Sequence, residues 1–228
     1  MGKFFSLKVL IKGAGEMASG VGSVLHRAGF RVAFTEIRPP LCVRRTVSFC
    51  EALYGGRMKV EDLEAVLASD IRDIETAWDR GVMAVVVDPD MSILSSLKPD
   101  MLIDATVAKK NLGLRMDMAE LTVGLGPGFS AGRDVHVVVE TNRGHDLGRL
   151  IHDGAAAPNT GEPGLIAGQS VRRVLRAPIP GRVETDLEIG AMVREGQEIL
   201  RVDGRPVQAS LTGVLRGLIR PGSRVEKA

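Results

Sequence analysis

Three small residues near the N-terminus have the types and the spacing of a nucleotide-binding turn. Gly13, Gly15 and Ala18 form a G-x-G-x-x-A pattern between an apolar run and a helical pattern. In such a turn the first glycine allows a tight corner, the second lets the backbone approach a pyrophosphate, and the third position lets helix and strand pack closely. Glu36 follows Gly15 by 21 positions, where an acid binds ribose hydroxyls in NAD-type sites. The pattern predicts a ligand that carries a phosphate.

The same residues also fit a purely structural turn that binds no nucleotide, because proteins can keep a fold without keeping its ligand. Glu16 also places negative charge close to the expected phosphate position. Against this, the N-terminus of the predicted helix would present N–H groups and a partial positive charge to an anion. We therefore favour a phosphate-bearing ligand, such as NAD(P), another nucleotide or a molybdopterin-type cofactor.

Further polar and glycine residues follow other predicted strands. Since parallel strands end at one edge of a sheet, residues that follow them can line one cleft. A second glycine cluster could form an anion nest or only an ordinary turn. Charged residues elsewhere could bind an anion or move a proton, although a solvated loop is the commoner explanation. The additional candidates are Gly124, Gly126, Gly128, Asp104, Lys109, Asn111, Glu140, Arg143 and His145.

The motifs of several enzyme classes are lacking in the sequence. It has no H-E-x-x-H, no C-x-x-C pair and no G-x-S-x-G, so a zinc protease or a hydrolase has no motif in its favour. Cys42 and Cys50 are poorly spaced for zinc, and we expect no metal site and read both as buried small apolar residues. The catalytic residues, if the chain is an enzyme, stay unassigned.

Composition narrows the class of protein. Of 228 residues 44% are hydrophobic and 25% charged, and 30 basic against 28 acidic side chains leave a net charge of +2. Such a balance does not favour a nucleic-acid or membrane partner. Two cysteines do not make a secreted disulfide framework, and no apolar run is long enough for a membrane span. We expect a cytoplasmic globular protein.

The pattern of elements predicts an α/β fold. Residues 8–12 and 30–36 are expected as strands around a helix over 16–28, which is the size of a βαβ unit. Four more strands are expected near residues 83–89, 101–105, 121–129 and 134–141, and a helix from Ser69 to Gly81. Residues 44–54 fit a strand or a short helix, and residues 58–68 a hairpin or a helix. The result is a Rossmann-like, mostly parallel sheet with helices on both faces, over residues 1–165.

Residues 166–228 are expected to form a small all-β module. Gly181, Gly190 and Val193 are matched 32 positions later by Gly213, Gly222 and Val225, and this repeat resembles a biotinyl/lipoyl-like barrel-sandwich fold. The second half of the repeat has no counterpart to the last strand of the first half. We therefore expect either that the β module is truncated or that another segment completes it. A carrier needs a lysine at the central hairpin, where Arg205 stands. We therefore expect that the module carries no covalent lipoyl or biotin group. We expect it to serve as an interaction or dimerisation module, and a homo-oligomer of the chain is one possible result.

Several longer stretches resemble one protein family. "IKGAGEMASGV", "RRTVSFCEALYGG", "GLGPGFSAGRDVHVVVETNRGHDLGRLI" and "APNTGEPG" are similar to the selenium-dependent molybdenum hydroxylase system proteins of the YqeB type. The resemblance implies an accessory or maturation role for molybdenum hydroxylases, with the hydroxylase or its maturation factors as partners. Two other functions stay open: an NAD(P)-dependent oxidoreductase that uses Glu36 to select NAD, and a non-catalytic scaffold that docks a hydroxylase subunit through the β module.

Overall fold

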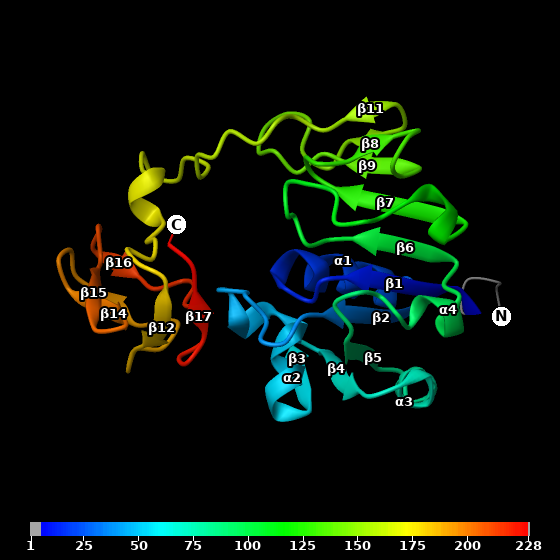
Figure 1. Ribbon diagram of the computed structural model, residues 1–228, viewed down its shortest axis with the longest axis horizontal. Coiled ribbons are helices and arrows are strands. Elements are labelled where there is room, and N and C mark those ends of the chain that lie inside the picture. The colour runs from blue at the N-terminus through cyan, green and yellow to red at the C-terminus, as the bar shows by residue number, and fades with distance from the viewer. Residues whose placement is uncertain (1–5, 228) are drawn as a thin grey trace. The chain divides into compact units, whose positions relative to one another are not determined.

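A mixed α/β architecture with a mostly parallel central sheet is confirmed. The computed structural model describes residues 6–227, and within them a nine-stranded sheet has the order β10-β9-β7-β6-β1-β2-β5-β4-β3 (Figure 1). The strands are β1 Lys8–Lys12, β2 Arg31–Glu36, β3 Arg57–Val60, β4 Leu63–Ala68, β5 Met83–Val87, β6 Met101–Asp104, β7 Leu121–Leu125, β9 Val137–Val139 and β10 Leu150–Ile151. All neighbours from β9 to β4 pair parallel, whereas the edge strands β10 and β3 pair antiparallel.

The strand–helix–strand unit predicted from the glycine pattern is confirmed. β1 and β2 pair in parallel register from Lys8 with Arg31 to Lys12 with Thr35. Helix α1, Glu16–Arg27, connects them and is followed by Gly29, whose φ of 93° ends the helix. β2 lies on one side of β1 and β6 on the other. The sheet therefore has its topological switch point between β1 and β6, which is where open α/β sheets bind ligands.

Helices cover both faces of the sheet. Neighbouring strand residues point to opposite faces, so Leu10 and Ile11 identify the two sides. α1 packs on the Ile11 side, since a Cβ on its Gly22 would lie 3.4 Å from Ile11 Cδ1. α3, Ile71–Asp79, packs Ile74 and Trp78 into the same buried cluster as Leu10. Its N-cap is Asp70 and not Ser69 as predicted, because the Asp70 carboxylate accepts the N–H groups of the first turn.

The two ambiguous segments are settled by the structure. β3 and β4 form the hairpin alternative, and residues 44–54 hold short helices: η2 Arg45–Val47, η3 Phe49–Glu51 and α2 Ala52–Gly55. The remaining short elements are α4 Leu94–Leu97, η4 Met116–Met118, and the paired strands β8 Ser130–Ala131 and β11 Gly154–Ala155. Among the described residues, none of the helices is long and apolar enough to cross a membrane.

The chain forms two compact units. One comprises the chain up to Pro40 together with Val47–Asn159, and the other comprises Leu41–Thr46 and the chain from Thr160 onward. Inside the second unit the Leu218 N–H donates to the Val43 carbonyl at 2.7 Å, so the early segment is hydrogen-bonded to the late one. The domain boundary predicted after residue 165 stays a prediction.

Strand pairing in the second unit follows the sequence repeat. Its strands are β12 Gly181–Glu184, β13 Met192–Val193, β14 Glu198–Val202, β15 Arg205–Gln208, β16 Gly213–Val214 and β17 Arg224–Val225, after a 3-10 turn η5 Val171–Arg173. β12 pairs with β17 through Gly181 and Val225, and β16 pairs with β13 through the repeat-related Gly213 and Val193. Each half therefore pairs with the other, as expected when neither half can bury its apolar face alone.

Candidate functional site

The corner after β1 is fixed by backbone hydrogen bonds. Gly13 adopts φ of 92°, a conformation that favours glycine, and its N–H donates to the Thr35 carbonyl at 2.8 Å. The Ala14 carbonyl accepts the Cys50 N–H at 2.9 Å and the Ser19 hydroxyl at 3.2 Å. The tight turn predicted for Gly13 is therefore present and held by hydrogen bonds, and the chain enters α1 directly after it.

The first turn of α1 has N–H groups to offer. Gly15 is the N-cap residue and supplies no side-chain acceptor, and the first backbone bond of the helix runs from Ser19 N–H to the Gly15 carbonyl. The four N–H groups at the start of the helix have no hydrogen-bond acceptor within residues 6–227, as is usual for the first turn of a helix. They belong to Gly15, Glu16, Met17 and Ala18. Together with the helix dipole they favour a negatively charged group at this position.

Glu36 lies beside this turn and contacts it directly. Its carboxylate accepts the Ala14 N–H at 2.8 Å and the Ile37 N–H at 2.8 Å. Burial raises the pKa of Glu36, and these two N–H donors act in the opposite direction. A carboxylate offers about four lone-pair positions, so the two bonds leave acceptor capacity for a ligand hydroxyl. The structure thus gives Glu36 a role that the sequence did not suggest, which is to hold the glycine corner in place.

The end of β6 faces the same corner. A Cβ on Gly13 would lie 3.5 Å from the Cα of Thr106, so the two loops touch. Asp104 ends β6, is fully buried, and uses Oδ1 to accept both the N–H of Thr106 at 3.0 Å and its hydroxyl at 2.6 Å. Its Oδ2 is buried without a hydrogen-bond partner among residues 6–227. Asp104 therefore belongs at the switch point, as the strand pattern indicated.

Lys12 lies at the same strand edge and was not among the candidates from the sequence. It stands in register with Asp104 on the neighbouring strand, so both side chains lie on one face of the sheet. The side chain is only 9% exposed, and its Nζ donates to the Leu112 carbonyl at 2.9 Å. An ammonium has three donors, which leaves two for other groups. The signal in the sequence is a lysine at the last position of a buried strand, immediately before the glycine turn.

The second glycine corner is filled by the protein itself. A Cβ on Gly124 would lie 2.5 Å from Cδ2 of Phe129, and one on Gly128 would lie 2.5 Å from the backbone nitrogen of Lys110. Gly126 meets the side chain of Thr141 and donates its N–H to the Val139 carbonyl at 2.9 Å. These glycines allow close packing. β7 also stands two strands from β1, roughly 10 Å at the usual spacing of about 4.8 Å.

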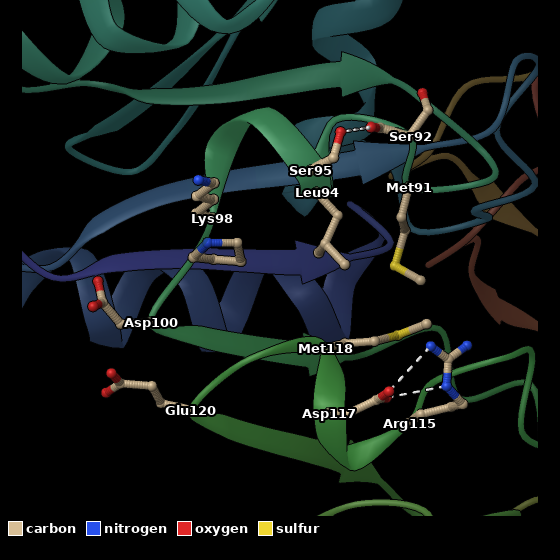
Figure 2. Close-up of a pocket in the computed structure, with 11 residues that line it drawn as sticks. Met91, Ser92, Leu94, Ser95, Lys98, Asp100, Arg115, Asp117, Met118 and Glu120 are labelled. Carbon is tan, nitrogen blue, oxygen red and sulfur yellow. Dashed lines mark hydrogen bonds and ion pairs between the residues drawn. The ribbon is translucent and has the colours of Figure 1, made fainter.

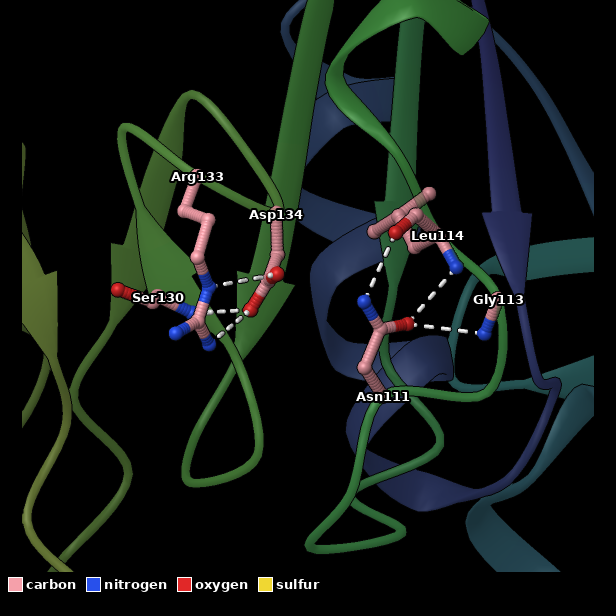
Figure 3. A network of polar contacts seen from close by, with 6 residues as sticks. All are labelled: Asn111, Gly113, Leu114, Ser130, Arg133 and Asp134. Atoms are coloured by element: carbon pink, nitrogen blue, oxygen red, sulfur yellow. Dashed lines mark hydrogen bonds and ion pairs between the residues drawn. The ribbon is translucent and has the colours of Figure 1, made fainter.

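The loop between β6 and β7 is shaped by its own side chains (Figure 3). Asn111 Oδ1 accepts the N–H groups of Gly113 and Leu114, and its Nδ2 donates to the Leu114 carbonyl at 2.8 Å. All of these contacts hold the turn. Lys109 is exposed and has φ of 63°, an uncommon backbone conformation for a lysine. Asn111 is therefore a structural residue, and Lys109 lies on the surface of the loop.

Arg143 and His145 lie in the exposed turn between β9 and β10. β9 is three strands from β1, so the structure does not bring these two side chains together with Gly13. Glu140 at the end of β9 is buried and accepts N–H groups from Ala157 at 2.7 Å and Asn142 at 2.7 Å. Burial acts to raise the pKa of Glu140, but its backbone donors outweigh burial and lower it. Glu140 anchors the loops at this edge.

A groove of about 650 Å³ lies elsewhere on the same unit (Figure 2). The side chains of Met91, Leu94 and Met118 gather in it between the α4 segment and residues 115–120, and Arg115 pairs there with Asp117 at 3.0 Å. None of the eleven residues that line it belongs to the sites predicted from the sequence. The groove and the switch point are therefore separate features.

Comparison with known proteins gives one informative relative. The chain is similar to a protein of Escherichia coli (strain K12) that bears the name "Uncharacterized protein YqeB". The two are 46% identical over 217 residues, which is 95% of this chain and 40% of the relative. The chain thus spans about two fifths of the length of that protein. No family model matches the chain, and no solved structure matches it significantly.

Proposed function

We propose that the chain binds a phosphate-bearing small molecule at the carboxyl edge of the sheet, between β1 and β6. The phosphate would sit on the N–H groups of Gly15 to Ala18 at the start of α1. The observation that carries this proposal is an uncapped N-terminus of a twelve-residue helix at the topological switch point. At the end of the neighbouring strand β6, the buried Asp104 has one oxygen without a partner among residues 6–227. Gly124, Gly126 and Gly128 take no part, because protein atoms fill their corner.

Calorimetric titration of the purified chain with NAD, NADP, ADP, GDP and molybdopterin-type compounds tests this proposal. Gly15→Asp is the informative variant, since Gly15 has the extended φ of −68° and ψ of −174° that suits an N-cap. An aspartate there would accept the N–H groups of the first turn and add a negative charge, so stability should hold or rise while binding is lost. Gly20→Asp, which adds the same charge in open space on α1, should still bind. Absence of binding to every compound at millimolar concentration would refute the proposal.

We further propose an accessory or maturation role for molybdenum hydroxylases. Support comes from the resemblance of the sequence to the YqeB-type proteins and from the 46% identity to one of that name. The role would be tested by purifying a molybdenum hydroxylase from cells with and without the chain and measuring its cofactor content. Equal content in both preparations would contradict the role but leave the ligand site untouched.

The β module is proposed to be a barrel-sandwich fold of the biotinyl/lipoyl type that serves docking. The swapped pairing of its two sequence halves supports this fold. The β14–β15 hairpin turns at Asp203 and Gly204, with φ of 42° and 77°, and offers no lysine for acylation. A hydroxylase subunit that still binds the chain after deletion from Arg173 onward would contradict a docking role.

An NAD(P)-dependent oxidoreductase is a second candidate, favoured by the position of Glu36 at the end of β2. The sequence contains a single tyrosine, Tyr54, and has no Tyr–Lys pair that would relay a proton. Oxidation of NADH or NADPH in the presence of redox-active acceptors would support this candidate. Failure to oxidise either cofactor at a concentration that saturates the site would remove it.

A further inference from the structure

Two aspartates are buried at strand ends, Asp88 directly after β5 and Asp104 as the last residue of β6, and they differ in their hydrogen bonding. Asp88, after β5, is 6% exposed and uses both oxygens: Oδ1 accepts the Ser92 N–H at 2.9 Å and its hydroxyl at 2.7 Å, and Oδ2 accepts the Ile93 N–H at 2.9 Å. Asp104, at the end of β6, is fully buried and uses only Oδ1. Its Oδ2 has no partner in the described part of the chain. A buried carboxylate oxygen without a partner is costly to the folded protein.

The position of Asp104 Oδ2 suggests why the protein tolerates the cost of an unpaired buried oxygen. Asp104 is held in one orientation by the two bonds to Thr106, and Thr106 touches the Gly13 corner. The carboxylate therefore lies at the end of the strand next to β1, and Thr106, which it holds, contacts the Gly13 corner. It is not neutralised in an ion pair with Lys12, whose Nζ instead donates to Leu112. Among the described residues, a buried acceptor without a partner is thus held in one orientation at the strand end next to the Gly13 corner.

We infer that Asp104 is a ligand-binding residue: its Oδ2 accepts a hydrogen bond from a neutral donor, a hydroxyl or a ring N–H, that the ligand carries beside its phosphate. This inference rests on the proposed phosphate site and specifies the class of molecule that fills it. A carboxylate repels a phosphate, so it selects against a bare anion and for an organic phosphate with a donor close by. The ligand is therefore a phosphate ester of a hydroxylated or N–H-bearing molecule.

The test compares Asp104→Asn with Asp88→Asn, using inorganic pyrophosphate, ADP, GDP and NAD as probes in calorimetry and thermal unfolding. In Asp104→Asn the amide oxygen keeps the Thr106 contacts, and an amide donor replaces Oδ2. We expect a Tm at or above that of the natural chain and an affinity for the best organic phosphate at least about tenfold lower, with affinity for pyrophosphate equal or higher. Asp88→Asn should lower Tm and leave all affinities unchanged.

The outcomes separate the two proposals. Organic phosphates that bind no better than pyrophosphate, or that bind Asp104→Asn as well as the natural chain, would overturn the inference and leave the phosphate site standing. A Tm that falls in Asp104→Asn as it does in Asp88→Asn would mark Asp104 as a structural residue and also overturn it. If pyrophosphate and all the organic probes fail to bind the natural chain, the proposed function fails and the inference fails with it.

Discussion

Alanine at Gly22 should loosen the packing of α1 on the sheet, whereas alanine at Gly20 should stabilise the helix. A Cβ on Gly22 would lie 2.7 Å from Cε1 of Phe34, closer than carbon atoms pack. Phe34 is fully buried, and the ring of Phe49 lies 5.7 Å from it, so the Phe34 ring has no room to withdraw. Gly20 is in the same helix with nothing within 4 Å of a Cβ.

The magnitudes follow from these two environments. Glycine in a helix interior costs about 1 kcal/mol relative to alanine, so Gly20→Ala should raise stability by about that amount. Gly22→Ala gains the same helix propensity but suffers overpacking of up to about 3 kcal/mol, which leaves a net loss of about 2 kcal/mol. For a chain of this size 1 kcal/mol corresponds to about 2–4 °C in Tm. The two variants should therefore differ by about 3 kcal/mol.

Urea and thermal unfolding of the two variants and the natural chain measure this difference. A displaced α1 also moves its first-turn N–H groups, so Gly22→Ala should weaken pyrophosphate binding while Gly20→Ala should not. If Gly22→Ala proves as stable as Gly20→Ala, the described packing between α1 and β2 is wrong. The position of the proposed phosphate site would then lose its basis.

Three further predictions concern single polar residues. The lowered pKa of Glu140 means that its ionised form stabilises the fold above its ordinary value of 4.5 and that this stabilisation is lost as pH falls through the folded value. Glu140→Gln should therefore cost about 1–3 kcal/mol at pH 7 and less in acid. The raised pKa of Glu36 means that the folded state favours the protonated form, so the natural chain should lose stability relative to Glu36→Gln as pH rises from 4.5 through the folded value. Arg182 and Arg224 face each other across β12 and β17, so Arg224→Glu should stabilise the chain by up to about 1 kcal/mol.

Unfolding followed across the pH range checks the two glutamates, with each variant compared to the natural chain in the same buffers. A Glu140→Gln penalty that grows in acid would contradict the assignment of its backbone donors. A Glu36→Gln variant that loses stability relative to the natural chain as pH rises would contradict burial as the dominant influence on Glu36. For Arg224→Glu, an unchanged Tm at low salt would show that the two arginines do not repel each other in solution.

The sequence was most informative where local chemistry decides the structure. Short β-branched strands, the Gly13 turn and the helix that follows it were read correctly, because strand burial, positive φ and helix periodicity all depend on neighbouring residues. The ambiguous segments around α2 and β3 were decided by tertiary packing, which no local pattern contains. Local sequence patterns likewise do not predict the order of the strands in the sheet. β5 lies between β2 and β4, although β4 precedes β5 in the chain.

The candidate site was predicted in part. Gly13, Gly15, Ala18, Glu36 and Asp104 gather at the switch point, because their strands are neighbours in the sheet. The candidates near β7 and β9 follow strand ends that lie two and three strands from β1, so they do not gather with Gly13. The glycines after β7 resemble an anion nest in sequence, yet their missing side chains make room for aromatic and backbone atoms. Only three-dimensional contacts distinguish the two uses of glycine.

The central claim is that an anion binds the first turn of α1. It is tested most directly by adding pyrophosphate to ¹⁵N-labelled protein and following the backbone amide resonances. We predict saturable shifts that are largest at Gly15, Glu16, Met17 and Ala18, and their loss in Gly15→Asp. Resonances in this turn that do not move, or that move less than those of the groove around Met91 and Met118, would contradict the claim.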